Sequence, residues 1–154
     1  MDRAPDIDFR AESRTLAPEL QAVRRDLHRH PELGGKETRT AALIEERPRR
    51  LGLEVRTGVA GTGVVGVLHA RAKAPAIALR ADIDARGRAP ATGDDVVFFH
   101  REMPGVYWQL GSCDPARGYA HPLHSPRFDF DEELLALGAA VQARAAWELM
   151  AKEA

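Results

Sequence analysis

The sequence predicts a layered α/β protein, because two helical segments are followed at once by three short strands. The first helical segment spans residues 16–30, where four apolar residues recur at helical spacing: Leu16, Leu20, Val23 and Leu27. The second runs from residue 37 to residue 51, with Gly52 just past its end. The strand-like runs, each bounded by glycine or proline, are residues 53–57, 63–68 and 76–81.

Prolines and small polar residues mark the ends of the two helices. Thr15 or Ser13 is expected to cap the first helix, with Pro18 in its first turn. Pro31 should end that helix, because the residue before a proline is disfavoured in the α region. Pro48 lies inside the second helical pattern, where a proline costs about 3 kcal/mol or more. We therefore expect a kink or an early stop at this position.

The rest of the chain is organised around a short seam. The expected stretches are a loosely docked tail at residues 1–15, a structured part at 16–85, a seam at 86–93 and a second structured part at 94–154. The seam is rich in turn formers and carries no apolar period. Residues 105–111 predict a further strand, and Asp131 is expected to cap a final helix. The expected apolar face of that helix is Leu134, Leu135, Val141, Ala145 and Leu149.

Composition excludes several classes of protein. The chain has 22 Lys and Arg against 23 Asp and Glu, and this near-neutral balance argues against a nucleic-acid partner. Its single cysteine excludes an internal disulfide framework. No run approaches the roughly 18 apolar residues of a membrane span, so we expect no membrane partner. The polar N-terminus lacks the apolar stretch of a secretory signal, which predicts a cytoplasmic location.

A glycine pattern at residues 61–66 formally matches the dinucleotide-binding motif G-x-G-x-x-G. That motif requires its glycines between a strand and a helix, so that the helix N-terminus meets the pyrophosphate. Here the glycines open a strand instead, and Pro75 leaves no room for a crossover helix. A tight turn leading into a strand is the favoured interpretation.

Several acids and histidines could carry chemistry. His28 and His30 are two residues apart and do not share a helix face, so a position at a helix C-terminus is favoured over a metal site. Asp82 and Asp84 follow a strand-like run, where carboxylates either line a ligand crevice or form a turn. His121 and His124 lie in a loop, and Cys113 has no second cysteine nearby.

Five segments together resemble the metal-dependent amidohydrolases that cleave N-acyl amino acids, the family of hippurate hydrolase and aminoacylase. These segments are residues 24–33 (RRDLHRHPEL), 61–66 (GTGVVG), 79–85 (LRADIDA), 104–107 (PGVY) and 124–132 (HSPRFDFDE). They occur in the order that the family shows. The resemblance implies a zinc-peptidase-like α/β fold in which residues 16–85 and 94–154 are the N-terminal and C-terminal parts of the catalytic domain.

The resemblance also implies a reaction in which two divalent metals, such as zinc, manganese or cobalt, activate water for attack on an amide. Of the family's metal ligands only His124 has a counterpart, while Asp82, Asp84 and Asp95 map near the site. The Cys-Gly-His motif, the Glu-Glu pair with the general base and the lid or dimerisation domain have no counterpart, because the seam stands in their place.

We therefore expect an internally truncated protein that has lost amide hydrolysis and binds no metal stably. One alternative is a hydrolase with a rebuilt site, drawn from His28, His30, His121, His124, Asp82, Asp84, Asp94 and Asp95. Another is a binding or assembly module that pairs with a full-length relative. Removal of central strands exposes sheet edges, which favours self-association.

Overall fold

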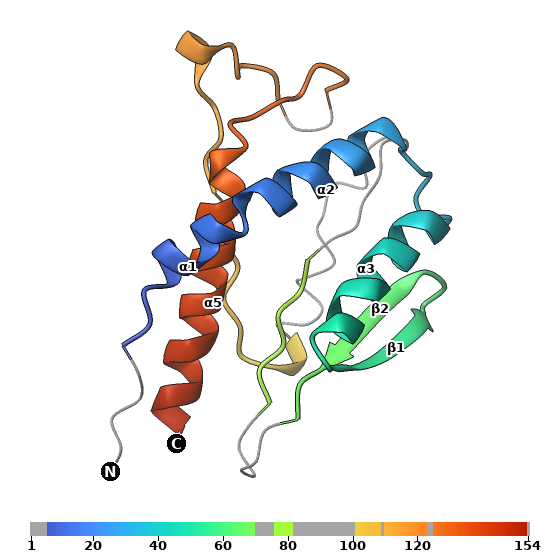
Figure 1. The fold of residues 1–154 in the computed structure, drawn as a ribbon, viewed down its shortest axis with the longest axis vertical. Coiled ribbons are helices and arrows are strands. Elements are labelled where there is room, and N and C mark those ends of the chain that lie inside the picture. The colour runs from blue at the N-terminus through green and yellow to red at the C-terminus, as the bar shows by residue number, and fades with distance from the viewer. Residues whose placement is uncertain (1–5, 70–75, 82–100, 109, 123–124, 154) are drawn as a thin grey trace.

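The computed structural model describes residues 6–69, 76–81, 101–108, 110–122 and 125–153, and it combines helices with a two-stranded sheet (Figure 1). The helices are α1 (Phe9–Thr15), α2 (Ala17–Arg29), α3 (Thr38–Arg50) and α5 (Glu133–Glu153), with a 3₁₀ turn η1 (Pro115–Arg117). The strands are β1 (Glu54–Val59) and β2 (Gly63–Val67). This mixture of helices and strands confirms the α/β class. No described helix is long and apolar enough to cross a membrane.

Helix α1 lies in the segment where a loose tail was expected, so that expectation is wrong for residues 9–15. The Asp8 carboxylate caps the helix by accepting hydrogen bonds from the backbone N–H groups of Arg10 and Ala11, at 3.1 and 3.0 Å. Helix α1 packs against α5, and the rings of Phe9 and Trp147 lie 6.1 Å apart (Figure 1). Helix α1 has seven residues, which is too few for an amphipathic pattern to be detected in the sequence.

Helix α2 begins and ends close to where the prolines place it, but its predicted N-cap is wrong. Pro18 lies in the first turn, and His30 follows the last helical residue, as expected. The residue at the N-cap position is Leu16, because α1 runs up to it directly. The Thr15 and Ser13 hydroxyls instead donate to backbone carbonyl oxygens within α1, at 2.6 and 3.3 Å.

Helix α3 does not stop at Pro48, which corrects the expectation of an early end. It continues to Arg50, and the left-handed Gly52 follows with a φ of 77°. Pro48 lies in the last turn, so its missing N–H removes a single helical hydrogen bond. The carbonyl oxygen of Pro48 accepts a hydrogen bond from the Leu53 N–H at 3.0 Å, which leads the chain into β1.

The sheet is an antiparallel hairpin covered on one face by α3. Strand β1 pairs with β2 in a register that places Arg56 opposite Val65, with an irregularity between Thr57 and Val59. Both strands confirm the runs expected at residues 53–57 and 63–68. The strands expected at residues 76–81 and 105–111 are wrong for the described residues, since neither run is hydrogen-bonded into a sheet. Residues 76–81 lie beside α5, where the Gln142 amide donates to the Arg80 carbonyl oxygen at 3.5 Å.

The helical part is held by contacts between segments that are far apart in sequence. Helices α1 and α2 both pack against α5, and α2 runs from this cluster towards α3 and the hairpin (Figure 1). Among the described residues the buried apolar ones are Ala136 and Ala140 of α5, so the core-facing side of this helix differs from the predicted one. Val141 and Leu149 are 40% and 47% exposed. The packing of α1 and α2 on α5 means that the parts on either side of the seam are in contact.

Several large apolar side chains lie on the surface of the described parts of the chain. Among them are Leu51, Leu68 and Val106, each more than three-quarters exposed.

Candidate functional site

The four residues that the resemblance places at or near the family's site, Asp82, Asp84, Asp95 and His124, lie outside the described residues. Asp94 of the proposed rebuilt site lies outside them as well. The structure describes the other motif segments, at residues 24–33, 61–66, 104–107 and 125–132.

The two histidines of the first motif lie at the C-terminal end of α2. His30 is the residue after the helix, and its Nδ1 is 3.0 Å from the Asp26 carbonyl oxygen. The same nitrogen is 3.3 Å from a carboxylate oxygen of Asp26. This position confirms the helix-terminal interpretation, in which imidazole complements the exposed carbonyl groups of the last turn. His121 is exposed in its loop.

Glu32 of the same motif caps the next helix. Its carboxylate accepts hydrogen bonds from the backbone N–H groups of Arg39 at 2.9 Å and Thr40 at 2.7 Å. These are unpaired donors in the first turn of α3, where negative charge also meets the favourable end of the helix dipole. The backbone hydrogen bond from Arg39, followed by that from Thr40, lowers the pKa of Glu32 to about 2. Glu32 is therefore held as a carboxylate that joins the end of α2 to the start of α3.

Glu37 ties the same loop to the sheet. One of its carboxylate oxygens accepts from the Gly35 N–H and the other from the Thr62 hydroxyl, both at 2.8 Å. The residue is 5% exposed, and the hydrogen bond from Thr62 is the largest cause of its lowered pKa. Thr62 lies in the turn between β1 and β2, so this side chain fixes the hairpin against α3.

The glycines at residues 61–66 build this hairpin rather than a nucleotide site. Gly61 lies in the turn between the two antiparallel strands, and Gly63 and Gly66 are part of β2, as the tight-turn interpretation requires. A Cβ atom on Gly63 would stand 2.5 Å from the Val59 carbonyl oxygen, so no larger residue fits there. A Cβ on Gly66 would meet Pro48 at 3.2 Å, which shows how closely α3 approaches β2. Gly63 and Gly66 thus have a packing reason, whereas Gly61 has a φ of 107° in the turn.

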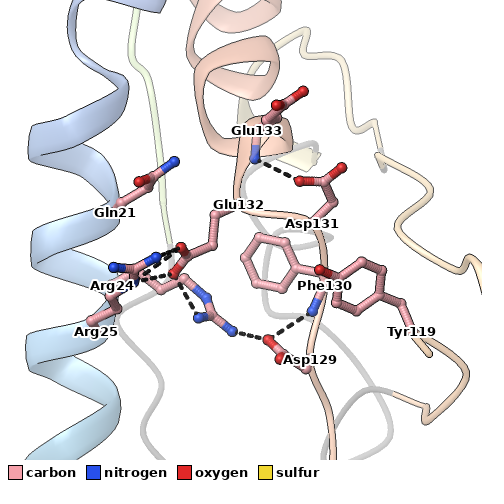
Figure 2. Close-up of a pocket in the computed structure, with 9 residues that line it drawn as sticks. All are labelled: Gln21, Arg24, Arg25, Tyr119, Asp129, Phe130, Asp131, Glu132 and Glu133. Atoms are coloured by element: carbon pink, nitrogen blue, oxygen red, sulfur yellow. Dashed lines mark hydrogen bonds and ion pairs between the residues drawn. The ribbon is translucent and has the colours of Figure 1, made fainter. Parts of the chain in front are cut away.

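A cluster of charged residues joins α2 to the start of α5 (Figure 2). Glu132 accepts from Arg24 at 2.9 Å and from Arg25 at 2.5 Å, and Arg24 is also paired with Asp129. The Arg24 guanidinium lies over the Phe130 ring, 4.6 Å from its centroid. The hydrogen bond from Arg25 is the largest cause of the lowered pKa of Glu132. These contacts connect motif segments more than a hundred residues apart.

The same cluster surrounds an open hollow of about 380 Å³. Its lining residues are Gln21, Arg24, Arg25, Tyr119, Asp129, Phe130, Asp131, Glu132 and Glu133. Asp131 caps α5 by accepting from the Glu133 N–H at 3.1 Å, as expected, and is also paired with Arg117. Arg24 and Arg25 therefore pair with Asp129 and Glu132 inside this hollow, and Asp131 pairs with Arg117 beside it.

The described residues do not fit the two-metal centre that the resemblance implies. Within the described parts of the chain, no group of three or more His, Cys, Asp or Glu could hold a metal ion. Three of the acids that line the hollow, at residues 129, 131 and 132, are each paired with an arginine. An arginine beside a carboxylate competes directly with a cation for its oxygens.

The structural roles of these acids were missed in the sequence. Glu32 caps a helix that begins six residues later, whereas the usual capping pattern is local. Glu37 reaches a residue 25 positions away, and the arginines of α2 reach acids more than a hundred positions away. The sequence does show that acids recur within the motif segments. It does not show which residues these acids bind in the folded chain.

Part of the chain is homologous to known amide and peptide hydrolases. It is 40% identical to the N-acetyl-L-cysteine deacetylase of Bacillus subtilis over 51% of this chain and 19% of that protein. It is 45% identical to thermostable carboxypeptidase 1 of Saccharolobus solfataricus, over 58% of this chain and 22% of the relative. The hippurate hydrolase of Campylobacter jejuni is 41% identical over 46% of this chain and 18% of its own length.

These matches confirm the resemblance that the motifs indicated: the matched half of the chain is related to amidohydrolases of the aminoacylase type. The chain spans about a fifth of the length of these curated relatives. No protein-family model matches the chain. No solved structure matches it either.

Proposed function

We propose that this chain is an internally truncated amidohydrolase-like protein that keeps the family's scaffold contacts and does not hydrolyse N-acyl amino acids by itself. One observation carries the proposal. Glu32 and Glu132 of the described motif segments are already engaged in structural contacts, and Glu37, which lies outside these segments, binds Thr62 of one of them. The relatives' activities are hydrolyses of amide or peptide bonds, so the lost reaction is of that class.

The electrostatics of these acids supports this proposal. A general base works best when its pKa lies near the operating pH and when it reaches the attacking water. Hydrogen bonds hold the pKa of Glu32 at about 2 and lower the pKa values of Glu37 and Glu132. A carboxylate in such a setting is a weak proton acceptor at neutral pH, because its charged form is already stabilised.

The sequence of the seam supports the same conclusion. Residues 86–93 stand where the family carries its Cys-Gly-His ligands and its Glu-Glu base, and they contain neither motif. His124 alone corresponds to a family ligand, whereas a catalytic metal usually takes about three protein ligands. In this proposal the lid and dimerisation domain are absent and no metal is stably bound.

Metal retention combined with hydrolysis tests the proposal. The purified full chain is incubated with zinc, manganese or cobalt, desalted, and assayed for bound metal and for cleavage of N-acetyl and N-benzoyl amino acids. We expect retention well below one metal per chain and no cleavage above the buffer rate. Near-stoichiometric metal together with cleavage that is lost in His124→Ala would overturn the proposal in favour of a rebuilt site.

A further inference from the structure

The described helices and strands fall into two packing groups. Helices α1 and α2 pack against α5 and against each other, whereas α3 packs against β1 and β2 (Figure 1). We call the first set the helical group and the second set the hairpin group. Among these described elements, every extensive contact lies within one group or the other. Helices α2 and α3 are therefore neighbours along the chain that belong to different groups.

The loop between α2 and α3 belongs to the hairpin group almost from its beginning. Glu32 accepts hydrogen bonds from the backbone N–H groups of Arg39 and Thr40 in α3, at 2.9 and 2.7 Å. Glu37 is 5% exposed and accepts a hydrogen bond from the Thr62 hydroxyl in the hairpin turn, at 2.8 Å. The loop is thus held to α3 near its start and to the hairpin at its end.

The connection from α2 to the hairpin group is confined to His30 and Pro31, which are both exposed. The N–H of His30 donates to the carbonyl oxygens of Asp26 and Leu27, each at 3.2 Å, so His30 still belongs to the end of α2. Its ψ is 64°, and a residue before proline also favours ψ values of about 120–160°, so a second backbone position is open to it. A few residues at the end of an element are sufficient for a hinge. The chain crosses back to the helical group between residues 69 and 76, outside the described residues.

Two ion pairs cross from α2 to α3. Asp26 near the end of α2 pairs with Arg39 at 2.6 Å, and Glu19 near its start pairs with Arg47. The hydrogen bond from Arg39 is the largest cause of the lowered pKa of Asp26, which therefore stays a carboxylate at neutral pH. The side chains of Arg39 and Arg47 are 43% and 38% exposed. An exposed ion pair shifts an equilibrium by about two- to fivefold and is screened by salt, so both pairs are weak enough to open.

The other ion pairs that the structure describes on these two helices stay within one group. They are Arg24 with Asp129 and Glu132, Arg25 with Glu132, Asp26 with Arg29 and His30, Glu45 with Arg49, and Glu46 with Arg50. Residues 129 and 132 precede α5 and so belong with the helical group. The two crossing pairs are therefore distinct from the rest of the charged surface of α2 and α3.

We propose that His30 and Pro31 form a hinge, and that the ion pairs of Asp26 with Arg39 and of Glu19 with Arg47 form a latch across it. In the closed arrangement, which is the one described above, the latch holds α3 to α2. In the open arrangement both pairs are broken, and the hairpin group swings away from α2 as one unit with its internal hydrogen bonds intact. Salt favours the open arrangement, because it screens the two pairs. This inference goes beyond the proposed function and does not depend on it.

Spin-label distances between the two groups test the latch in the full chain. In a Cys113→Ser background, Ala22→Cys on α2 and Leu51→Cys at the end of α3 report the separation of the groups, since both positions are exposed. Pulsed electron paramagnetic resonance should show a second, longer distance that gains population as sodium chloride rises from about 0.05 M to 1 M, where the Debye length is about 3 Å. Leu51→Cys with Val59→Cys, both in the hairpin group, is the control pair of labels and should keep one distance at every salt concentration.

Removal of the latch charges gives a second test at low salt. Glu19→Gln with Asp26→Asn should raise the ratio of open to closed chains by about tenfold, because two exposed pairs are lost. Glu45→Gln with Glu46→Gln removes the same number of charges from pairs inside α3 and is the matched control, which should leave the ratio unchanged. Charge reversal by Glu19→Arg with Arg47→Glu should keep both the closed arrangement and its response to salt. A single distance that neither salt nor the latch variant changes would overturn the proposal, and so would an equal change in the matched control or in the control pair of labels.

Discussion

Glu37 offers the sharpest test of the contacts that join the motif segments. Its carboxylate accepts one hydrogen bond from the Gly35 N–H and one from the Thr62 hydroxyl, at 2.8 Å each. The side chain is almost completely buried between α3 and the hairpin turn. Glu37→Ala removes both acceptors at once and leaves the two donors without a partner.

The magnitude follows from these two bonds. A hydrogen bond to a charged group contributes about 1.5–3 kcal/mol, and the two contributions are not fully additive because they share one carboxylate. We therefore expect Glu37→Ala to lower the free energy of unfolding by about 2–3 kcal/mol. Urea-induced unfolding followed by far-ultraviolet circular dichroism at pH 7 measures this loss. A double-mutant cycle with Thr62→Val should show a coupling of roughly 1 kcal/mol.

Glu46→Ala is the control on the same helix. Glu46 is half exposed and paired with Arg50 four residues away, so its removal should cost about 0.5 kcal/mol or less. Equal losses for Glu37→Ala and Glu46→Ala, or an absence of coupling between Glu37 and Thr62, would refute the assigned role. Glu37 would then not be the side chain that fixes the hairpin against α3.

Three further results are expected. Gly63→Ala should destabilise the chain by more than about 2 kcal/mol, because its Cβ meets a backbone carbonyl oxygen, whereas Gly111→Ala meets nothing and should be neutral in the same melt. Glu32 has a folded-state pKa of about 2 against an ordinary value of 4.5, so between these two pH values the unfolded chain binds more protons than the folded chain. Stability should therefore fall as the pH drops from about 5 to 2, and Glu32→Gln should reduce that slope in acid titration. Arg24→Ala should cost about 1–2 kcal/mol and loosen α2 from α5, detected as faster amide exchange in α5; unchanged exchange would contradict the contact with Glu132.

The elements that could be predicted from sequence are those with local signals. The spacing of Leu20, Val23 and Leu27, with prolines at both ends, placed α2 correctly. Alternation and bounding glycines placed both strands of the hairpin. The run at residues 76–81 has the same composition, but a strand also requires a hydrogen-bonded neighbour, and composition does not supply one.

The contacts that support the candidate site were less accessible to such reasoning. Glu32, Glu37 and Glu132 act over separations of seven to 108 residues, and no periodicity encodes those partners. Helix α1 was missed because its two turns depend on packing against α5 rather than on a pattern of its own. The resemblance to amidohydrolases could be recognised because it rests on short segments in a fixed order, which can be seen in the sequence without knowledge of the fold.

The central claim is that the family's motif residues here hold the fold together and no longer perform amide hydrolysis. The most direct measurement is the rate of N-benzoyl amino acid cleavage by the purified chain, preloaded in turn with zinc, manganese and cobalt. We expect a rate indistinguishable from that of buffer with the same metal, and the same rate for His124→Ala. Cleavage above the buffer rate that disappears in His124→Ala would contradict it.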